Sequence, residues 1–338
     1  MIVKKKPILQ GFANSNRVKK LSGVEIEFSE FNPIFYDIET TGLSRTKACV
    51  YLIGAVKLEE NCWILYQWMS ENSSEEKDLL NKFSDFITGA TCTIQYNGSR
   101  FDQPFLEERY KQNNMSSPFK NIPAVDLYQL LKPCQKLFKL PHMKQPDLEN
   151  LIEISSRNYC DGGRCISLYN SYIKNKNVKY AEIVMGHNEE DLLGLGKIYN
   201  LLVIKCIFNG DYTPMKCDII DEKIKFCLQL PMDSPVNLSN GNIEFYIKID
   251  NRSVNLLISM KNNRLKLYYH DYKNYHYIPS EDMAIPKSLG KYMDKSLLKP
   301  ATKDTCYTWV KCNADFLSSK EKQLKYLRQI LPYYLANI

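Results

Sequence analysis

The sequence lacks a long apolar segment, a C-x-x-C pair, a low-complexity tract and an internal repeat. No segment approaches the length of a membrane-spanning helix, and the opening residues MIVKKKPILQGF lack the apolar core and cleavage site of a signal peptide. The eleven cysteines, an odd number, are scattered too widely for a zinc site, and the tightest pairs are Cys160/Cys165 and Cys306/Cys312. We therefore expect a soluble, cytoplasmic protein with reduced thiols and no membrane contact.

The composition is that of a globular protein. Hydrophobic residues make up 44% of the 338 residues and charged residues 25%, which excludes a disordered chain and allows two ordinary domains. The net charge of +7 is compatible with a polyanionic partner, although ordinary cytosolic enzymes also carry such an excess.

The first part of the chain predicts a mixed sheet. Runs of β-branched and aromatic residues predict strands at 34–39, 49–58 and 62–69, with links short enough for antiparallel hairpins. A capping box of Ser73 and Glu76 opens a predicted helix that ends at Gly89. A strand at 91–96, a helix at 103–112 and a strand at 122–127 follow. This order predicts a three-strand antiparallel meander continued by right-handed parallel crossovers and flanked by helices, as in an RNase H-like fold.

Beyond residue 130 the pattern is less regular. Residues 137–167 read as irregular, and helices are predicted at 168–174 and 188–208. Strands are predicted at 223–230, 243–250, 254–260 and 264–270, with Ser239-Asn240-Gly241 as a turn and a closing helix at 320–335. We place a domain boundary near residue 210, which gives an α/β domain at 1–209 and a smaller α+β domain of antiparallel strands at 210–338.

The stretch FYDIETTGL places two carboxylates at the end of a predicted buried strand. Asp37 and Glu39 alternate with Ile38 and therefore point to one side of the strand. Two buried carboxylates repel each other, and a divalent metal ion is the natural compensation. An acidic strand end that faces solvent is the alternative. Asp147-Leu148-Glu149 has the same spacing but follows Pro146 in a helix-like stretch, where residues two apart do not share a face.

Two further segments carry acidic residues in a suggestive context. Asp102, in YNGSRFDQPFL, follows a predicted strand, at the edge where open α/β sheets bind ligands, although a helix cap explains it equally well. His187 and Asp191 lie four apart on a helical pattern and share a face, although a histidine at a helix start is commonly a surface residue. Gly194 and Gly196 predict close packing of this helix against the sheet.

These segments together resemble the DEDD superfamily of 3′-to-5′ exonucleases, and within it the predicted exonuclease family typified by YprB. The resemblance spans about residues 30–205, and the segments that carry it are YDIETTGL (36–43), YNGSRFDQPFL (96–106), RNYCDGGRCISLY (157–169) and HNEEDLLGL (187–195).

The resemblance implies a metal-dependent exonuclease that hydrolyses single-stranded DNA or RNA from its 3′ end. It implies a two-metal mechanism with two Mg²⁺ or Mn²⁺ ions, held by Asp37, Glu39, Asp102 and Asp191. His187 would be the general base, because imidazole titrates near neutral pH. One feature departs from the superfamily: the histidine type usually places His five residues before the last Asp, and the four-residue spacing usually carries Tyr.

Other residues receive weaker assignments. The resemblance implies substrate contacts at Thr40, Gly42, Leu43, Asn97 and Phe101, although a turn explains Asn97 well. Asp126 reads as a helix cap, and Arg157 and Arg164 either contact phosphates or are solvated. The tyrosines of LYYHDYKNYHYIP, interleaved with lysines such as Lys266, Lys273, Lys287, Lys291 and Lys295, either stack on unpaired bases or serve the structure, which we favour. The alternatives for the whole chain are a nucleic-acid-binding or scaffold protein with little activity and an endonuclease on the same fold.

Overall fold

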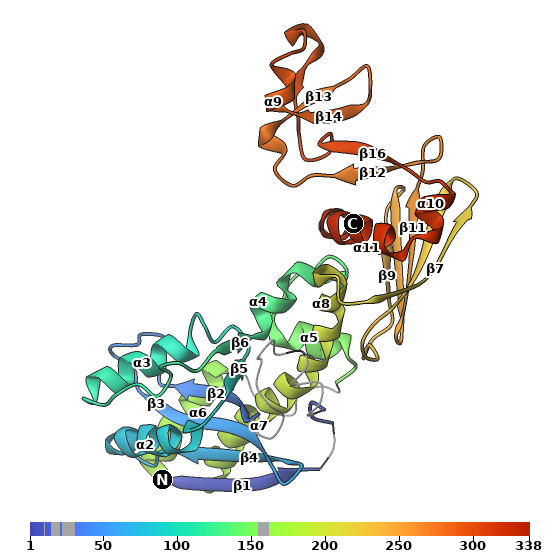
Figure 1. The fold of residues 1–338 in the computed structure, drawn as a ribbon. Coiled ribbons are helices and arrows are strands. Elements are labelled where there is room, and N and C mark those ends of the chain that lie inside the picture. The colour runs from blue at the N-terminus through green and yellow to red at the C-terminus, as the bar shows by residue number, and fades with distance from the viewer. Residues whose placement is uncertain (10, 15–20, 22–30, 155–161) are drawn as a thin grey trace. The chain divides into compact units, whose positions relative to one another are not determined.

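The computed structural model describes residues 1–9, 11–14, 21, 31–154 and 162–338 (Figure 1). These residues form two compact units. Unit 1 comprises Met1–Lys132 and His142–Leu202, and unit 2 comprises Pro133–Pro141 and Val203–Ile338. The predicted independent domains, 1–209 and 210–338, stay a prediction.

Unit 1 is built around one sheet with helices on both faces. Its strands are β1 (Ile2–Ile8), β2 (Pro33–Thr40), β3 (Val50–Glu59), β4 (Cys62–Met69), β5 (Cys92–Gln95) and β6 (Ala124–Asp126). Its helices are α2 (Glu76–Ile87), α3 (Asp102–Gln112), α4 (Leu127–Leu131), α5 (Gln145–Leu151), α6 (Gly162–Asn175) and α7 (Val178–Ile198), with short 3₁₀ turns η2 (Ser73–Glu75) and η4 (Tyr199–Leu201) and, at the end of the Met1–Lys132 segment, η3 (Lys132–Cys134).

The strand order of this sheet is β1-β4-β3-β2-β5-β6. β2, β3 and β4 form an antiparallel meander, whereas β5 pairs parallel to β2 and β6 pairs parallel to β5. This confirms the predicted meander followed by parallel crossovers. The link between β3 and β4 turns tightly because Glu60 and Asn61 both adopt left-handed backbone angles.

The sequence did not predict β1, which pairs antiparallel with β4 along its whole length. Its lysines hide the strand pattern, yet they suit an edge strand, because Lys4 and Lys6 both pair with Glu189 of α7. Pro7 is tolerated for the same reason, since an edge strand has backbone groups without a ladder partner.

The two faces of the sheet bury different side chains. Tyr36, Ile38 and Ile53 pack with Leu79 and Phe83 on the face covered by α2 and α3. The neighbouring positions on β3 and β4 point the other way, where residues of α6 and α7 cover them (Figure 1). Because side chains alternate along a strand, Asp37 and Glu39 lie on the α7 face, opposite to Tyr36 and Ile38.

Helix α11 (Lys320–Asn337) begins at Lys320 as predicted and α3 begins one residue early, whereas other helices differ more from the prediction. Asn72 accepts the Ser74 N–H at the start of η2, and Glu76, which the predicted capping box included, forms a buried ion pair with Arg109. The helix predicted at 188–208 begins ten residues earlier, where the Asn177 side chain accepts the Lys179 N–H. His187 therefore lies in the middle of a helix rather than at its start. Gly89, as predicted, is left-handed.

Unit 2 consists mainly of antiparallel strands. A five-stranded sheet has the order β7 (Thr213–Ile220), β8 (Lys223–Gln229), β11 (Ser253–Ser259), β10 (Phe245–Asp250), β9 (Leu238–Gly241). The other strands form a pair, β12 (Arg264–Tyr268) with β16 (Tyr307–Lys311), and a sheet β14 (Met283–Pro286), β13 (Tyr275–Ile278), β15 (Lys299–Pro300). The helices are α8 (Leu202–Asn209), α9 (Lys287–Gly290), α10 (Ala314–Ser318) and α11 (Lys320–Asn337), with 3₁₀ turns η5 (Tyr272–Asn274) and η6 (Lys295–Leu297).

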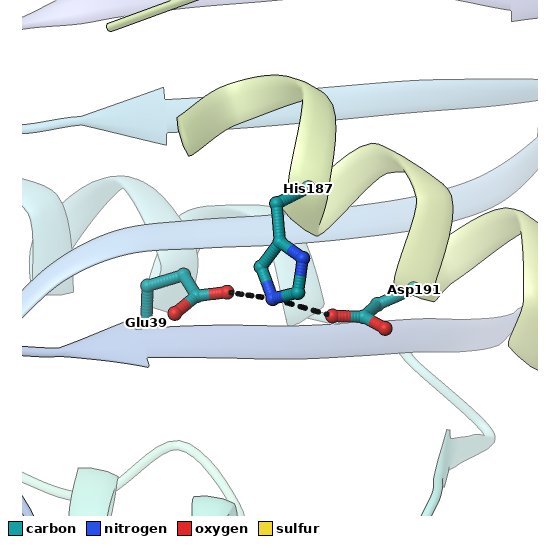
Figure 2. A group of neighbouring side chains, drawn as sticks. All are labelled: Glu39, His187 and Asp191. Atoms are coloured by element: carbon teal, nitrogen blue, oxygen red, sulfur yellow. Dashed lines mark ion pairs between the residues drawn. The ribbon is translucent and has the colours of Figure 1, made fainter. Parts of the chain in front are cut away.

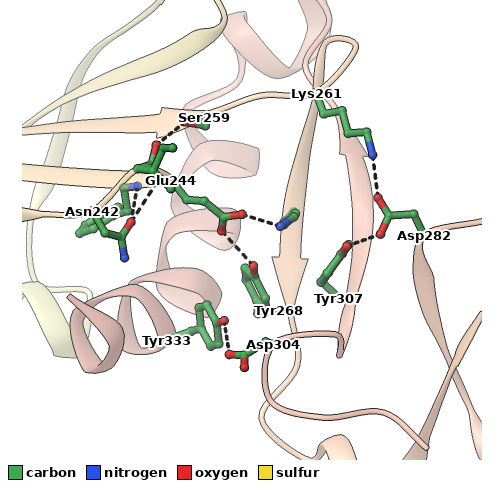
Figure 3. A network of polar contacts seen from close by, with 12 residues as sticks. Asn242, Glu244, Ser259, Lys261, Tyr268, Asp282, Asp304, Tyr307 and Tyr333 are labelled. Atoms are coloured by element: carbon green, nitrogen blue, oxygen red, sulfur yellow. Dashed lines mark hydrogen bonds and ion pairs between the residues drawn. The ribbon is translucent and has the colours of Figure 1, made fainter. Parts of the chain in front are cut away.

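Within unit 2, tyrosines and carboxylates tie the small sheets together (Figure 3). Glu244 accepts hydrogen bonds from Lys266 at 2.7 Å and from Tyr268 at 3.3 Å. Asp282 pairs with Lys261 and accepts a hydrogen bond from Tyr307. The turn predicted at residues 239–241 is wrong, because these residues belong to β9. In the described ranges, no helix is long and apolar enough to cross a membrane.

Candidate active site

Strand β2 carries two acidic side chains into the interior of unit 1. It lies between β3 and β5 in the sheet, and seven of its eight residues are buried. Glu39 is 8% exposed and Asp37 is half-buried. The β2–β3 register shifts between Glu39 and Thr40, which ends regular pairing directly after the second carboxylate. The solvent-facing alternative for the D-x-E stretch is therefore wrong.

Helix α7 places His187 and Asp191 above this strand. The Nε2 atom of His187 lies 3.4 Å from Oε1 of Glu39 and 3.2 Å from Oδ2 of Asp191 (Figure 2). The imidazole is 7% exposed, and its Nδ1 atom has no hydrogen-bond partner in the described part of the chain. His187 is thus held between two carboxylates rather than at the surface.

Close packing of α7 on the sheet depends on a glycine of β3. A Cβ atom at Gly54 would lie 2.0 Å from Oδ1 of Asn188 and 2.6 Å from Cδ1 of Leu192. The prediction that Gly194 and Gly196 make this contact is wrong, since their open sides face Glu149 and Phe12. The glycine that allows α7 to pack closely therefore lies in the sheet rather than in the helix.

Asn188 is a site residue that the sequence analysis did not single out. Its Nδ2 donates to Oδ2 of Asp37 at 2.9 Å, and its Oδ1 accepts from Nε2 of Gln67 at 2.9 Å. Gln67 of β4 also donates to the backbone oxygen of Met185. A glutamine in the otherwise apolar strand CWILYQWM was the available signal, because a buried amide needs partners.

Asp102 is the first residue of α3 and is 9% exposed. The N-cap position belongs to Phe101, which makes no side-chain capping bond, so Asp102 does not occupy the cap position. The turn before it needs Gly98, because a Cβ there would lie 2.3 Å from Oε1 of Gln95 and 2.8 Å from Oδ2 of Asp102. The turn therefore packs directly against the Asp102 carboxyl group.

Burial and mutual repulsion dominate the electrostatics of the site. Desolvation, followed by the charges of Asp191 and Asp102, raises the pKa of both Asp37 and Glu39 well above the usual range. Desolvation also raises the pKa of Asp102 to about 7, with smaller contributions from the charges of Asp126 and Asp191. Among the described residues, no lysine or arginine lies within ion-pair distance of Asp37, Glu39 or Asp102. Within the described residues, these three carboxylates therefore lack the lysine or arginine partner that buried carboxylates usually have.

The donor set fits a divalent metal ion. Glu39, His187 and Asp191 each offer one ligand atom, and these atoms lie within 4.8 Å of one another. Asp37 and Asp102 are within electrostatic reach of this group, as the pKa shifts indicate. Carboxylate oxygens are the ligands that Mg²⁺ and Mn²⁺ prefer.

The residues predicted to contact substrate differ in their exposure and in their contacts. Thr40 is buried and donates to the Gly42 carbonyl at 2.9 Å, whereas Leu43 is 83% exposed. Asn97 adopts a left-handed turn conformation with φ 57°, yet its buried Oδ1 has no partner in the described residues. Phe101 is half-buried, and its ring centroid lies 5.5 Å from that of Phe105.

Secondary candidates have structural roles or lie outside the described residues. Asp126 caps α4 by accepting the Tyr128 N–H, as predicted, and also accepts the Asn97 N–H. Arg164 is exposed in the first turn of α6 rather than in a loop, and Arg157 lies outside the described residues. Asp147 of the second D-x-E stretch accepts the Lys144 N–H at the start of α5.

A family model described as the RNase H superfamily matches residues 34–203, half of the chain. The chain belongs to the RNase H superfamily. The matched residues include all five candidate residues, Asp37 and Glu39 of β2, Asp102 of α3, and His187 and Asp191 of α7. No curated protein matches the chain.

Two solved structures show weaker likeness. A family B DNA polymerase from the archaeon Pyrobaculum calidifontis matches with a TM-score of 0.41 and 13% identity, over 52% of this chain and 26% of the polymerase. The chain thus spans about a quarter of that polymerase. A structure described as the apo form of a nuclease matches with a TM-score of 0.35 and 15% identity, over 59% and 81% of the two chains. Both TM-scores are too low for either likeness to bear on function.

Proposed function

We propose that this RNase H superfamily protein is a metal-dependent 3′-to-5′ exonuclease of the DEDD type that acts on single-stranded nucleic-acid ends. The convergence of Asp37, Glu39, Asp102, Asp191 and His187 from β2, α3 and α7 carries the proposal. Three of these carboxyl groups have pKa values raised by burial and by neighbouring carboxylates, which is the electrostatic state expected of a site for a divalent metal ion. Within the type, we propose the YprB-like family, which the motifs of the sequence resemble.

The four carboxylates would hold two Mg²⁺ or Mn²⁺ ions. When bound, such ions supply an activated water and neutralise charge on the transferred phosphoryl group and the leaving 3′-oxygen. Asn188 would keep Asp37 oriented toward the ions through its 2.9 Å hydrogen bond. Helix α7 holds His187 and Asp191 at a fixed distance from β2, because Gly54 leaves room for the helix to pack closely on the sheet.

His187 would take up the proton of the attacking water at Nε2, the ring nitrogen that faces Glu39 and Asp191. The four-residue spacing from Asp191, unusual for a histidine in this superfamily, is compatible with this role, since both side chains project from one face of α7. Thr40, Gly42, Leu43, Asn97 and Phe101 are proposed to contact the terminal nucleotides.

Cleavage of 5′-labelled single-stranded DNA and RNA oligonucleotides with Mg²⁺ or Mn²⁺ tests the proposal. A ladder that shortens one nucleotide at a time from the 3′ end is expected. Asp37→Asn should abolish the ladder, whereas the matched control Asp147→Asn, taken from the other D-x-E stretch, should leave it intact. Internal cuts would indicate an endonuclease, release of the labelled 5′ nucleotide the opposite polarity, and retention without cleavage a binding or scaffold protein; each contradicts the proposal.

A further inference from the structure

The tyrosines of residues 268–277 pack within unit 2, where Tyr268 is buried and the others are half-buried. Tyr268 stacks on Tyr333 with ring centroids 3.6 Å apart, and Tyr269 stacks on Tyr275 at 5.0 Å. Tyr277 donates to Asp282 at 2.8 Å. These contacts support the structural role that we favour for these tyrosines.

A different part of unit 2 carries uncompensated positive charge. Residues 287–303, which we call the lysine segment, contain five lysines and one aspartate and have a net charge of +4, out of +7 for the whole chain. The lysines recur every fourth residue, at Lys287, Lys291, Lys295, Lys299 and Lys303. All five are exposed, and within the described residues none forms an ion pair. About a twentieth of the chain thus carries more than half of its net charge.

The lysine segment is held against a small sheet. It begins at the end of β14 and contains β15, and both strands pair with β13. Helix α9 also packs tightly on β13, because a Cβ at Gly290 would lie 2.7 Å from Cδ2 of His276. The segment therefore presents its charges from an ordered platform, which reduces the entropy lost on binding.

One aromatic ring projects from the middle of the segment. Tyr292, between Lys291 and Lys295, is 88% exposed, in contrast to the packed tyrosines of residues 268–277. Exposed aromatic rings flanked by cationic side chains are the combination with which proteins bind single strands, through base stacking and phosphate contacts.

We propose that the lysine segment is a second contact surface for single-stranded nucleic acid, with its lysines on backbone phosphates and Tyr292 stacked on a base. The choice of partner rests on the proposed nuclease function, because an anionic membrane also attracts lysines. The apolar exposure is small for membrane insertion: beside Tyr292 the segment offers Leu289 and Leu297, which are 56% and 47% exposed.

The test measures binding without cleavage. The full chain in EDTA is titrated against a fluorescent 30-residue oligothymidylate, and the dissociation constant is determined by anisotropy at several salt concentrations. Replacing Lys287, Lys291 and Lys295 together by Gln should raise Kd roughly 10- to 100-fold and reduce the slope of log K against log salt by about 2, since each phosphate contact on a single strand contributes about 0.7. Tyr292→Ala should raise Kd roughly 5- to 100-fold.

A matched control replaces three exposed lysines of unit 1, Lys77, Lys82 and Lys179, by Gln, which removes the same charge elsewhere. Its Kd should change less than about twofold. An equal loss in this control, or an unchanged Kd in the lysine-segment variant, overturns the inference. Phosphatidylserine vesicles form a parallel arm: loss of vesicle binding with oligonucleotide binding retained identifies a membrane surface instead.

The readout separates this inference from the proposed function. If the parent fails to cleave with Mg²⁺ or Mn²⁺ but its binding falls in the lysine-segment variant, the nuclease proposal fails and the contact surface stands. If the parent cleaves and the variant binds as tightly as the parent, the contact surface alone fails.

Discussion

Replacing Asp102 by Asn should stabilise the protein in the absence of divalent ions. Burial raises the pKa of this carboxyl group from 3.8 to about 7, so ionising it costs free energy that the unfolded chain does not bear. About three pKa units at 1.36 kcal/mol each give an upper value of about 4 kcal/mol at pH 8. Because Asp102 titrates together with its neighbours, we expect a gain of about 2 to 4 kcal/mol.

The pH dependence fixes the sign of this effect. Between about pH 4 and pH 7 the folded protein binds more protons at Asp102 than the unfolded chain does, so stability falls as pH rises through this window. The difference between Asp102→Asn and the parent should be near zero at pH 4, grow up to pH 7 and stay constant above it. In the variant, this contribution to the pH slope is absent.

Thermal unfolding in EDTA, followed by scanning calorimetry from pH 5 to pH 8, measures the effect. A gain of 2 to 4 kcal/mol corresponds to about 4 to 16 °C in Tm for a unit of this size. Asp85→Asn, an exposed change on α2, serves as the control and should shift Tm by less than about 1 °C. Adding Mg²⁺ should raise the Tm of the parent more than that of Asp102→Asn. A variant less stable than the parent by the same amount at every pH would refute the reasoning.

Three further predictions concern residues in the candidate site and in the elements that support it. His187→Ala should lower the cleavage rate by roughly 10² to 10⁴ while the Mg²⁺-induced rise in Tm persists, and loss of that rise would make His187 a metal ligand instead. Gly54→Ala should cost about 1 to 3 kcal/mol in urea unfolding and reduce cleavage, because the new Cβ would displace α7; Gly162→Ala, with open space around the added atom, should do neither. Arg109→Met should destabilise unit 1 by about 3 to 5 kcal/mol, because it leaves the Glu76 carboxylate buried without its 2.6 Å partner, and an unchanged urea midpoint would contradict this.

The strands of the sheet were predictable because their apolar pattern is local. The runs that form β2, β3 and β4 are rich in β-branched and aromatic residues, and their observed bounds differ from the predicted ones by at most one residue. β1 was missed because three consecutive lysines interrupt the apolar pattern of this edge strand. Two of these lysines pair with Glu189, which lies on a helix far away in the sequence. A single-sequence pattern does not record which charges will meet in the fold.

In the candidate site, too, residues in a local pattern were predictable and residues that depend on distant partners were not. Asp37 and Glu39 were identified because their strand context is readable, and Asp102 because it follows the next strand. Asn188 was missed because its partners, Asp37 and Gln67, lie 151 and 121 residues away. The start of α7 was misplaced because the residues from Val178 to Gly186 are apolar on several sides and show no clear helical stripe, as expected of a helix that is buried against both the sheet and α6.

Within the described residues, neutral groups donate hydrogen bonds to two of the carboxylates of the candidate site, Asp37 and Asp102. Asn188 donates to Asp37, and the backbone N–H of Asp102 lowers the otherwise raised pKa of its own carboxyl group. A lysine in any of these places would stabilise the metal-free fold more strongly, yet it would also neutralise the negative charge that attracts a divalent ion. Neutral donors fix the positions of the oxygens and leave their charge intact. The repulsion that destabilises the metal-free protein is therefore the same free energy that a bound divalent cation would recover.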